Sequence, residues 1–184
     1  MNSDAPKVLQ LETARLELRL FRPEDLGTFA AMNADPEVMR HIGDGRPHDR
    51  TQATTTFERM RWHWAEHGFG RGAIERASDG AFLGFCGVAY PTFIASVATR
   101  PEIGWRLARE FWGQGYATEA AIAARDQYFG SFSFAELISL AHPDNVASHR
   151  VMRKIGMRRL PDLDTPERGP LVIHQLLRGE WEPR

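Results

Sequence analysis

The sequence contains a single cysteine, Cys86, among its 184 residues. One cysteine excludes an internal disulfide framework and is typical of a chain that folds in a reducing compartment. The formal net charge of −1 also lacks the basic excess that most nucleic-acid-binding proteins carry. We therefore expect neither a disulfide-stapled protein nor a nucleic-acid partner.

Long apolar runs are missing as well. No stretch approaches the ~18 apolar residues of a membrane span, and the first ten residues, MNSDAPKVLQ, lack the apolar segment of a secretory signal. A composition of 42% hydrophobic and 26% charged residues is typical of a globular domain. These features predict a cytoplasmic protein without a membrane partner.

Hydrophobic periodicity predicts one mixed α/β domain. Alternating or continuous apolar runs indicate strands at 15–21, 69–76, 81–90, 101–107, 136–141 and 171–177. Helices are expected from Pro23, over 51–67, after Gly115 to about Gly130, and over 144–155, the last with Ala147, Val151, Met152 and Ile155 inward. Consecutive strands should pair antiparallel, whereas a strand–helix–strand unit should be parallel.

The segment REFWGQGYATEAA places Gly113 and Gly115 directly before good helix formers. A helix start carries unpaired N–H groups and attracts anions, and glycines let an anion approach the backbone closely. An ATP-binding P-loop would need a lysine directly after the second glycine, and none is present. A dinucleotide fingerprint would need an acid at the end of the next strand, but Glu136 begins that strand.

Two motifs together resemble the GNAT family of acetyl-CoA-dependent N-acetyltransferases. The glycine pair matches the signature Gln/Arg-x-x-Gly-x-Gly/Ala, and Glu102-Ile103-Gly104-Trp105 before it is similar to the Rim branch, the ribosomal-protein N-terminal acetyltransferases. Asn145-Val146-Ala147-Ser148, followed by Lys154 and Gly156, resembles the family's Asn-x-x-Ser/Ala helix. The resemblance extends over residues 8–181 and indicates a single N-acetyltransferase domain.

This resemblance implies a GNAT fold, with a mixed, largely antiparallel sheet, helices on both faces and a parallel strand pair at the CoA site. It implies acetyl-CoA as co-substrate and no metal. The acceptor would be a primary amine, either of a protein N-terminus or of a small molecule, and it would attack acetyl-CoA directly in a ternary complex. Whether the protein forms a homodimer is left open. The cofactor-binding residues implied are Ile103, Trp105, Leu107, Gly113, Gln114, Gly115, Tyr116, Ala117, Thr118, Asn145 and Ser148.

Several residues are candidates for the base that deprotonates the amine and for the acid that protonates the thiolate. Glu102, on the strand 101–107 that the resemblance places beside the cofactor, is the first candidate for the general base. Its alternative role is that of an exposed strand acid. His142 or water could act as the base in place of Glu102. Many family members protonate the thiolate with a tyrosine on the helix after Asn145, where this chain has Met152. Ser148 lies one helical turn after Asn145 on the same face and is the Rim-like substitute, with water as the alternative.

Two other functions compete with this interpretation. The missing tyrosine leaves open a non-catalytic acyl-CoA-binding module. The segment His63-Trp64-Ala65-Glu66-His67 matches a zinc-peptidase pattern, although Gly68 directly follows it and no third ligand is marked.

The residues that flank the acceptor are less defined by the sequence. Specificity candidates are Arg40, His41, Arg46 and His48 between the first helices, and the hairpin 161–170. His174 stands where relatives often have an aromatic residue in the last strand. Cys86 lies in an apolar run and is expected to be a core residue rather than an acyl carrier. The identity of the acceptor stays open.

Overall fold

Antiparallel strands form the first half of the sheet in the computed structural model, which describes residues 10–165 and 169–183. Each strand pairs with the next in the chain. They are β1 (Gln10–Glu12), β2 (Leu16–Arg19), β3 (Arg71–Arg76), β4 (Phe82–Ala89) and β5 (Glu102–Leu107). The antiparallel pairing predicted for consecutive strands is confirmed. The expected domain start at Val8 lies outside the described residues.

The second half of the sheet begins with a crossover. β6 (Glu136–Ala141) lies parallel to β5, and β9 (Gly169–Leu177) pairs antiparallel with β6. The short strands β7 (Arg158–Arg159) and β8 (Leu163–Thr165) both pair with β9. The predicted parallel pair is therefore present. β7 and β8 escaped the sequence analysis because they are too short to show a period.

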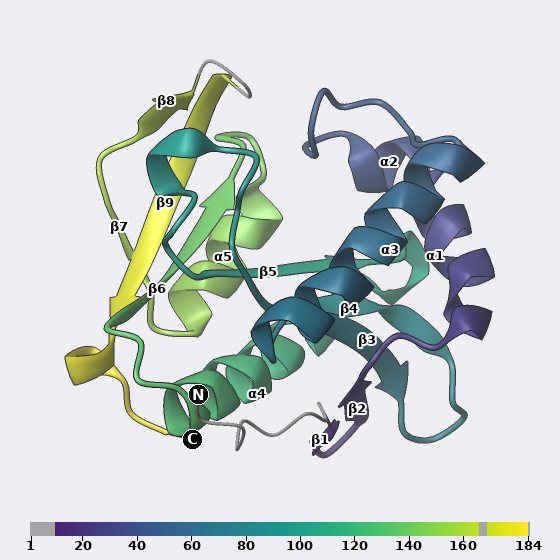
Figure 1. The fold of residues 1–184 in the computed structure, drawn as a ribbon, viewed down its shortest axis with the longest axis horizontal. Helices are drawn as coiled ribbons and strands as arrows, with labels where there is room; N and C mark the ends of the chain where they lie inside the picture. The colour runs from purple at the N-terminus through teal and green to yellow at the C-terminus, as the bar shows by residue number, and fades with distance from the viewer. Residues whose placement is uncertain (1–9, 166–168, 184) are drawn as a thin grey trace.

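Helices cover both faces of the sheet (Figure 1). α1 (Leu26–Asn33) and α3 (Arg50–His67) pack on one face, and α2 (Pro36–Met39) lies beside α1. α4 (Tyr116–Ser131) and α5 (Val146–Lys154) pack together on the opposite face. In the part of the chain that the structure describes, no helix is long and apolar enough to cross a membrane.

The first predicted helix is interrupted. The single-turn 3-10 helix η1 (Pro23–Asp25) leads into α1, which stops before Pro36. Proline has no N–H and clashes with the preceding turn, so the chain starts a new helix there instead. Asp35 caps this helix by accepting a hydrogen bond of 2.8 Å from the Glu37 N–H. The segment after α2 then runs into the site described below.

Small residues let α4 approach the sheet closely. Ala120, Ala121 and Ala124 are buried and belong to a core that also contains Cys86 and Ile103. The helix expected after Gly115 is therefore present and buries an alanine face against the sheet.

The inward face predicted for α5 was partly wrong. Met152 and Ile155 are fully buried, as expected, whereas Ala147 is exposed. Ala147 lies on the side of α5 that faces a cleft, where no side chain covers it. The helical period alone could not distinguish the core from the wall of an open cleft.

Candidate active site

The first residue of β5 pairs with the middle of β6. Their register contains the pair Glu102–Ile138, and the Ile138 N–H donates to the Pro101 carbonyl at 2.9 Å. On the other edge of β5, the Ala108 N–H donates to Leu83 O at 2.9 Å. Because backbone groups alternate along a strand, the N–H and C=O of Trp105 face the β6 side, beyond the paired segment. β5 thus offers a strand edge to an extended ligand.

A cleft of about 690 Å³ follows this edge to the start of α4. Nine of the residues predicted to bind the cofactor line it: Trp105, Leu107, Gly113, Gly115, Tyr116, Ala117, Thr118, Asn145 and Ser148. Two others do not. The side chain of Ile103 is fully buried in the core, and Gln114 turns its carbonyl oxygen away toward Arg15.

The glycine pair has the backbone geometry that its sequence predicts. Gly113 and Gly115 have φ values of +74° and +85°, a region that residues with a side chain rarely adopt. Gly115 is the N-cap of α4 and supplies no side-chain cap. The first-turn N–H groups therefore remain for a ligand, with the positive end of the helix dipole behind them. This cradle fits a pyrophosphate.

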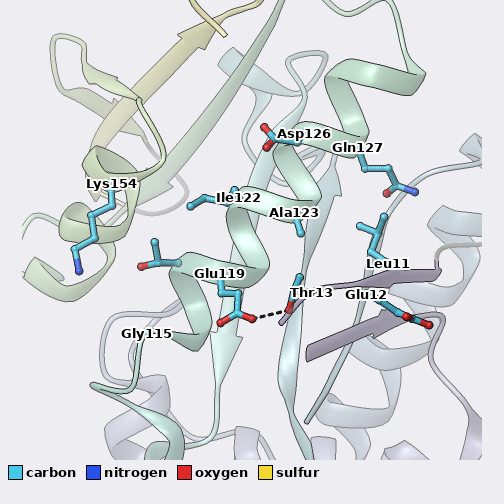
Figure 2. Close-up of a pocket in the computed structure, with 11 residues that line it drawn as sticks. Leu11, Glu12, Thr13, Gly115, Glu119, Ile122, Ala123, Asp126, Gln127 and Lys154 are labelled. Atoms are coloured by element: carbon cyan, nitrogen blue, oxygen red, sulfur yellow. Dashed lines mark hydrogen bonds between the residues drawn. The ribbon is translucent and has the colours of Figure 1, made fainter. Parts of the chain in front are cut away.

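A contact between the chain start and this loop escaped the sequence analysis. Arg15 Nη1 donates to the carbonyl oxygen of Gln114 at 3.1 Å, and Arg15 Nε donates to Glu119 Oε2 at 2.7 Å. Thr13 Oγ1 donates to Glu119 Oε1 at 2.6 Å (Figure 2). Burial opposes ionisation of Glu119, but the hydrogen bonds from Thr13 and Arg15 outweigh it and lower its pKa.

A second, smaller cavity of about 150 Å³ opens beside the cleft, on the α1–α3 side of β5. Its polar lining includes Glu102, Arg71, Arg106 and Ser139, and Phe85, Ile94 and Met152 add apolar walls. Both cavities share His41, Ile42, Trp105, Arg106, Asn145 and Ser148. The two cavities are therefore adjoining chambers of one site.

Glu102 lies in the smaller cavity with an ionic partner. Its Oε2 is 2.6 Å from Nη2 of Arg71, and only 6% of the residue is exposed. Arg71 reaches Glu102 across Gly104, where an added Cβ would come within 2.9 Å of Nη2. The alternative role considered for Glu102, that of an exposed strand acid, is therefore wrong. The bare Gly104 allows the guanidinium to lie against β5.

His142 and Ser148 both border the smaller cavity. His142 Nδ1 accepts a hydrogen bond of 3.2 Å from the Asp144 N–H, and the ring stacks on His41 with centroids 5.4 Å apart. Ser148 donates its N–H to Asn145 Oδ1 at 3.1 Å, so Asn145 caps α5 while facing the site. The structure thus brings all three catalytic candidates to one cavity.

The zinc-peptidase interpretation is not supported by the geometry. His63 Nδ1 bonds to Phe69 O at 2.8 Å, and Nε2 accepts the Tyr90 N–H at 3.1 Å. Both ring nitrogens are therefore occupied, and burial lowers the pKa of His63 to about 4. Glu66 and His67 are exposed at the end of α3. This motif serves the attachment of α3 to the sheet.

The buried cysteine is equally unsuited to chemistry. Cys86 is fully buried in the core, as expected, and burial raises the pKa of its thiol to about 12. A thiolate is the nucleophilic form. The single cysteine of the chain is therefore no acyl carrier.

Two of the four specificity candidates line the site. His41 borders both cavities and Arg40 the larger one, whereas the Arg46 side chain is 86% exposed and His48 borders neither. In the hairpin 161–170, residues 166–168 lie outside the described part of the chain. His174 is buried and stacks on His149, with ring centroids 5.5 Å apart, so it forms part of the packing of α5 on β9.

Comparison with known proteins agrees with this geometry. A family model described as an acetyltransferase (GNAT) domain matches residues 15–158. The chain therefore belongs to the GNAT family of acetyltransferases.

Its relatives include an uncharacterized N-acetyltransferase, YnaD, of Bacillus subtilis, 43% identical over 152 residues that cover 82% of this chain and 84% of that protein. The FsC-acetyl coenzyme A-N(2)-transacetylase of Aspergillus fumigatus is 33% identical over 182 residues, which cover 93% of this chain and 77% of that protein.

Solved structures show the same fold. The acetyltransferase from Agrobacterium tumefaciens str. C58 is 27% identical with a TM-score of 0.79, covering 96% of both chains. RimJ from Mycobacterium smegmatis, solved with CoA-disulfide, has a TM-score of 0.72 at 20% identity and covers 90% of this chain and 83% of that one. The Rim-like resemblance is confirmed. The protein is an acetyl-CoA-dependent N-acetyltransferase.

Proposed function

We propose that the protein acetylates a primary amine by direct attack of the amine on acetyl-CoA within a ternary complex. One observation carries this proposal: the two cavities meet at Trp105, Asn145 and Ser148. The larger cavity extends from this junction to the glycine cradle, and the smaller one extends to Glu102. A thioester and an amine that enter from opposite ends therefore meet at one point.

The backbone does most of the cofactor binding in this scheme. N–H groups at the start of α4 hold the pyrophosphate, and the open edge of β5 pairs with the amide-bearing arm as an added strand. The N–H of Trp105 lies on that edge and stabilises the oxyanion that develops on the thioester carbonyl. These donors belong to the main chain, and the edge of β5 is open for them because the β5–β6 register contains only the pair Glu102–Ile138.

The chemical step needs two proton transfers. The amine nitrogen attacks the thioester carbonyl carbon, the C–N bond forms, and the C–S bond breaks. Glu102 accepts the proton that the amine loses, directly or through water, and Ser148 or water returns a proton to the thiolate. An α-amine has a pKa near ~8 and a lysine amine near ~10.4, so a weaker base is enough to deprotonate an α-amine.

Two findings favour an amine acceptor and a direct transfer. A relative that aligns with 93% of the chain is named an N(2)-transacetylase, which places its acceptor atom on a nitrogen. The single cysteine is buried and protonated, which disfavours a thiol-bound acyl intermediate. His142 lies closer to solvent than Glu102 and is the alternative base.

The test combines calorimetry of CoA binding with a thiol-release assay on acetyl-CoA and a broad panel of amines. We expect CoA binding without an acceptor, and initial-rate plots whose lines intersect, as a ternary complex requires. Parallel lines would indicate a covalent acyl-enzyme and contradict direct attack. Absence of CoA binding would overturn the proposal, and CoA binding without turnover on any amine would favour a binding module.

A further inference from the structure

Arg71 reaches Glu102 from two strands away. Arg71 begins β3 and Glu102 begins β5, with β4 between them. The strand register places Arg71 opposite Gly87 of β4, and Gly87 opposite Gly104 of β5. Directly opposed residues project to the same face of a sheet, so this row offers the arginine a path without other side chains. Two glycines thus leave room for an ion pair that spans the sheet from β3 to β5.

The guanidinium of Arg71 packs against Gly104. A Cβ added to Gly104 would come within 2.9 Å of Arg71 Nη2 and 3.2 Å of Arg71 Nε. The same Nη2 donates to Glu102 Oε2 at 2.6 Å. Glu102 and Gly104 are alternate residues of β5 and therefore share a face of the sheet. Arg71 thus contacts β5 both by packing and by charge.

The main chain of Arg71 is held by α3. Trp64 Nε1 donates to the Arg71 carbonyl at 2.9 Å. The Trp64 indole also packs against Gly70, where an added Cβ would come within 2.5 Å of the ring. Arg71 is therefore fixed at both ends, at its backbone by Trp64 and at its guanidinium by Gly104 and Glu102.

Both partners of the ion pair are largely withdrawn from solvent. The exposed fraction of the side chain is 17% for Arg71 and 8% for Glu102. An ion pair at the exposed surface contributes little, whereas breaking a buried pair is costly because each charge has lost most of its water. The glutamate side chain has several rotatable bonds, and its contact with a fixed guanidinium restricts the positions that the carboxylate can adopt. Arg71 therefore determines where the Glu102 carboxylate lies in the cavity.

We propose that Arg71 is a positioning residue for acetyl transfer, which holds the Glu102 carboxylate toward the junction of the two cavities. This inference rests on the proposed role of Glu102 as the base. Among the described residues that line the two cavities, Arg71 belongs to the smaller one only. It therefore acts on the amine through Glu102 and not on acetyl-CoA. A misplacement of about 1 Å can cost about a hundredfold in rate, so the position of this carboxylate bears directly on kcat.

The experiment measures whether Arg71 and Glu102 act as one unit. Arg71→Met keeps an unbranched stem and removes the charge, so we expect kcat on the best amine of a broad panel to fall by about tenfold or more. KM for the amine and the Kd for CoA should change little. Arg71→Lys should restore part of kcat because the positive charge returns. Arg71→Met combined with Glu102→Gln should be no slower than Glu102→Gln alone, since no base is left to position.

Two further variants test the position of the guanidinium and the specificity of the effect. Gly104→Ala keeps both ionic side chains, but its Cβ displaces the guanidinium, so kcat should fall as well. Arg100→Met is the matched control, because Arg100 pairs with Glu136 at 2.7 Å outside both cavities and its loss should leave kcat unchanged. The melting temperature of each variant reports whether the fold is intact. If Arg71→Met fails to fold, Gly104→Ala decides the question.

The outcomes distinguish this inference from the proposed function. A further loss of kcat when Arg71→Met is added to Glu102→Gln, or a rise in KM alone, would show that Arg71 acts independently of Glu102 and would contradict its positioning role. Full activity of Arg71→Met and Gly104→Ala beside a slow Glu102→Gln would overturn the inference alone. Full activity of Glu102→Gln would overturn the proposed base and the role of Arg71 with it.

Discussion

Arg15, before β2, contacts the Glu119 carboxylate, in the first turn of α4, through both its main-chain N–H and its side chain. The Arg15 N–H donates to Glu119 Oε1 at 3.0 Å, and its guanidinium contacts Oε2 at 2.6 Å. The same guanidinium donates to the Gln114 carbonyl, between the two glycines of the proposed phosphate cradle. Arg15 thus holds the loop that we propose to bind the cofactor.

This contact predicts a change in CoA affinity. Replacing Arg15 by glutamine removes the charge that holds Gln114 and Glu119, so we expect the Kd for CoA to rise about tenfold. Arg61→Gln is the matched control, because Arg61 pairs with Glu58 at 3.1 Å on the outer surface of α3. Calorimetry on both variants measures the difference. Equal Kd values for the two variants would show that Arg15 does not position the cradle.

The left-handed backbone at Gly115 makes a second prediction. Gly115→Val forces a β-branched residue into a φ of +85°, which should reorient the cradle and weaken CoA binding by about tenfold or more. Gly130, inside α4, has open space at its Cβ position, and Gly130→Ala should keep the affinity and add about 0.5–1 kcal/mol of stability. Unchanged CoA affinity in a folded Gly115→Val protein would contradict the cradle.

Glu102 should be required for turnover and not for cofactor binding. Glu102→Gln keeps an acceptor for Arg71 but removes the base, so we expect kcat to fall by about a hundredfold with the Kd for CoA unchanged. Glu136→Gln is the control, since Glu136 pairs with Arg100 at 2.7 Å outside both cavities. Steady-state kinetics report the outcome. If Glu102→Gln retains full activity, His142 or water is the base.

Substitutions of Asn145 and Ser148 should have different effects, the first on stability and the second on catalysis. Asn145→Ala removes the cap that accepts the Ser148 N–H, so it should cost about 1 kcal/mol of stability. Ser148→Ala keeps that cap and removes only the hydroxyl, so kcat should fall by about tenfold, with water as the remaining acid. Chemical denaturation and kinetics on both variants test this. A stability loss in Ser148→Ala without a change in kcat would reverse the assignment.

Buried histidines predict a loss of stability in acid. Burial lowers the pKa of His174 to about 4, with Arg153 and Arg159 nearby adding to the effect, whereas a histidine of the unfolded chain titrates near ~6.5. The unfolded state therefore binds the proton first as the pH falls, and stability decreases from about pH 6.5 to about pH 4 by roughly 1–3 kcal/mol.

His174→Phe tests this contribution. Phenylalanine preserves the ring beside His149 and cannot be protonated, so the free energy of unfolding should change less between about pH 7 and about pH 5 than in the parent. His63→Phe is the contrasting variant. It loses the bonds to Phe69 O and the Tyr90 N–H, and it should be less stable at every pH. Identical pH slopes for His174→Phe and the parent would contradict the prediction.

Local chemistry explains what could be predicted from the sequence. Alternation marked the strands, proline and glycine marked the helix ends, and Gly113 and Gly115 indicated an anion at the start of α4. These signals lie within a few neighbouring residues, so they can be recognised without the tertiary structure. Asn145 and Ser148 were implied by the resemblance to the GNAT family, and their spacing places both on one face of a helix.

The partners of the predicted residues depended on contacts between distant segments. Arg71 lies 31 residues before Glu102, and nothing in either neighbourhood indicates the ion pair. Asn33 and Arg106 meet across 73 residues, and Arg15 reaches the glycine loop across 99. The sequence by itself determined the longer strands and helices and the left-handed glycines before α4. Only the tertiary structure decided the lining of the smaller cavity, because that lining depends on which side chains the sheet brings together from distant parts of the chain.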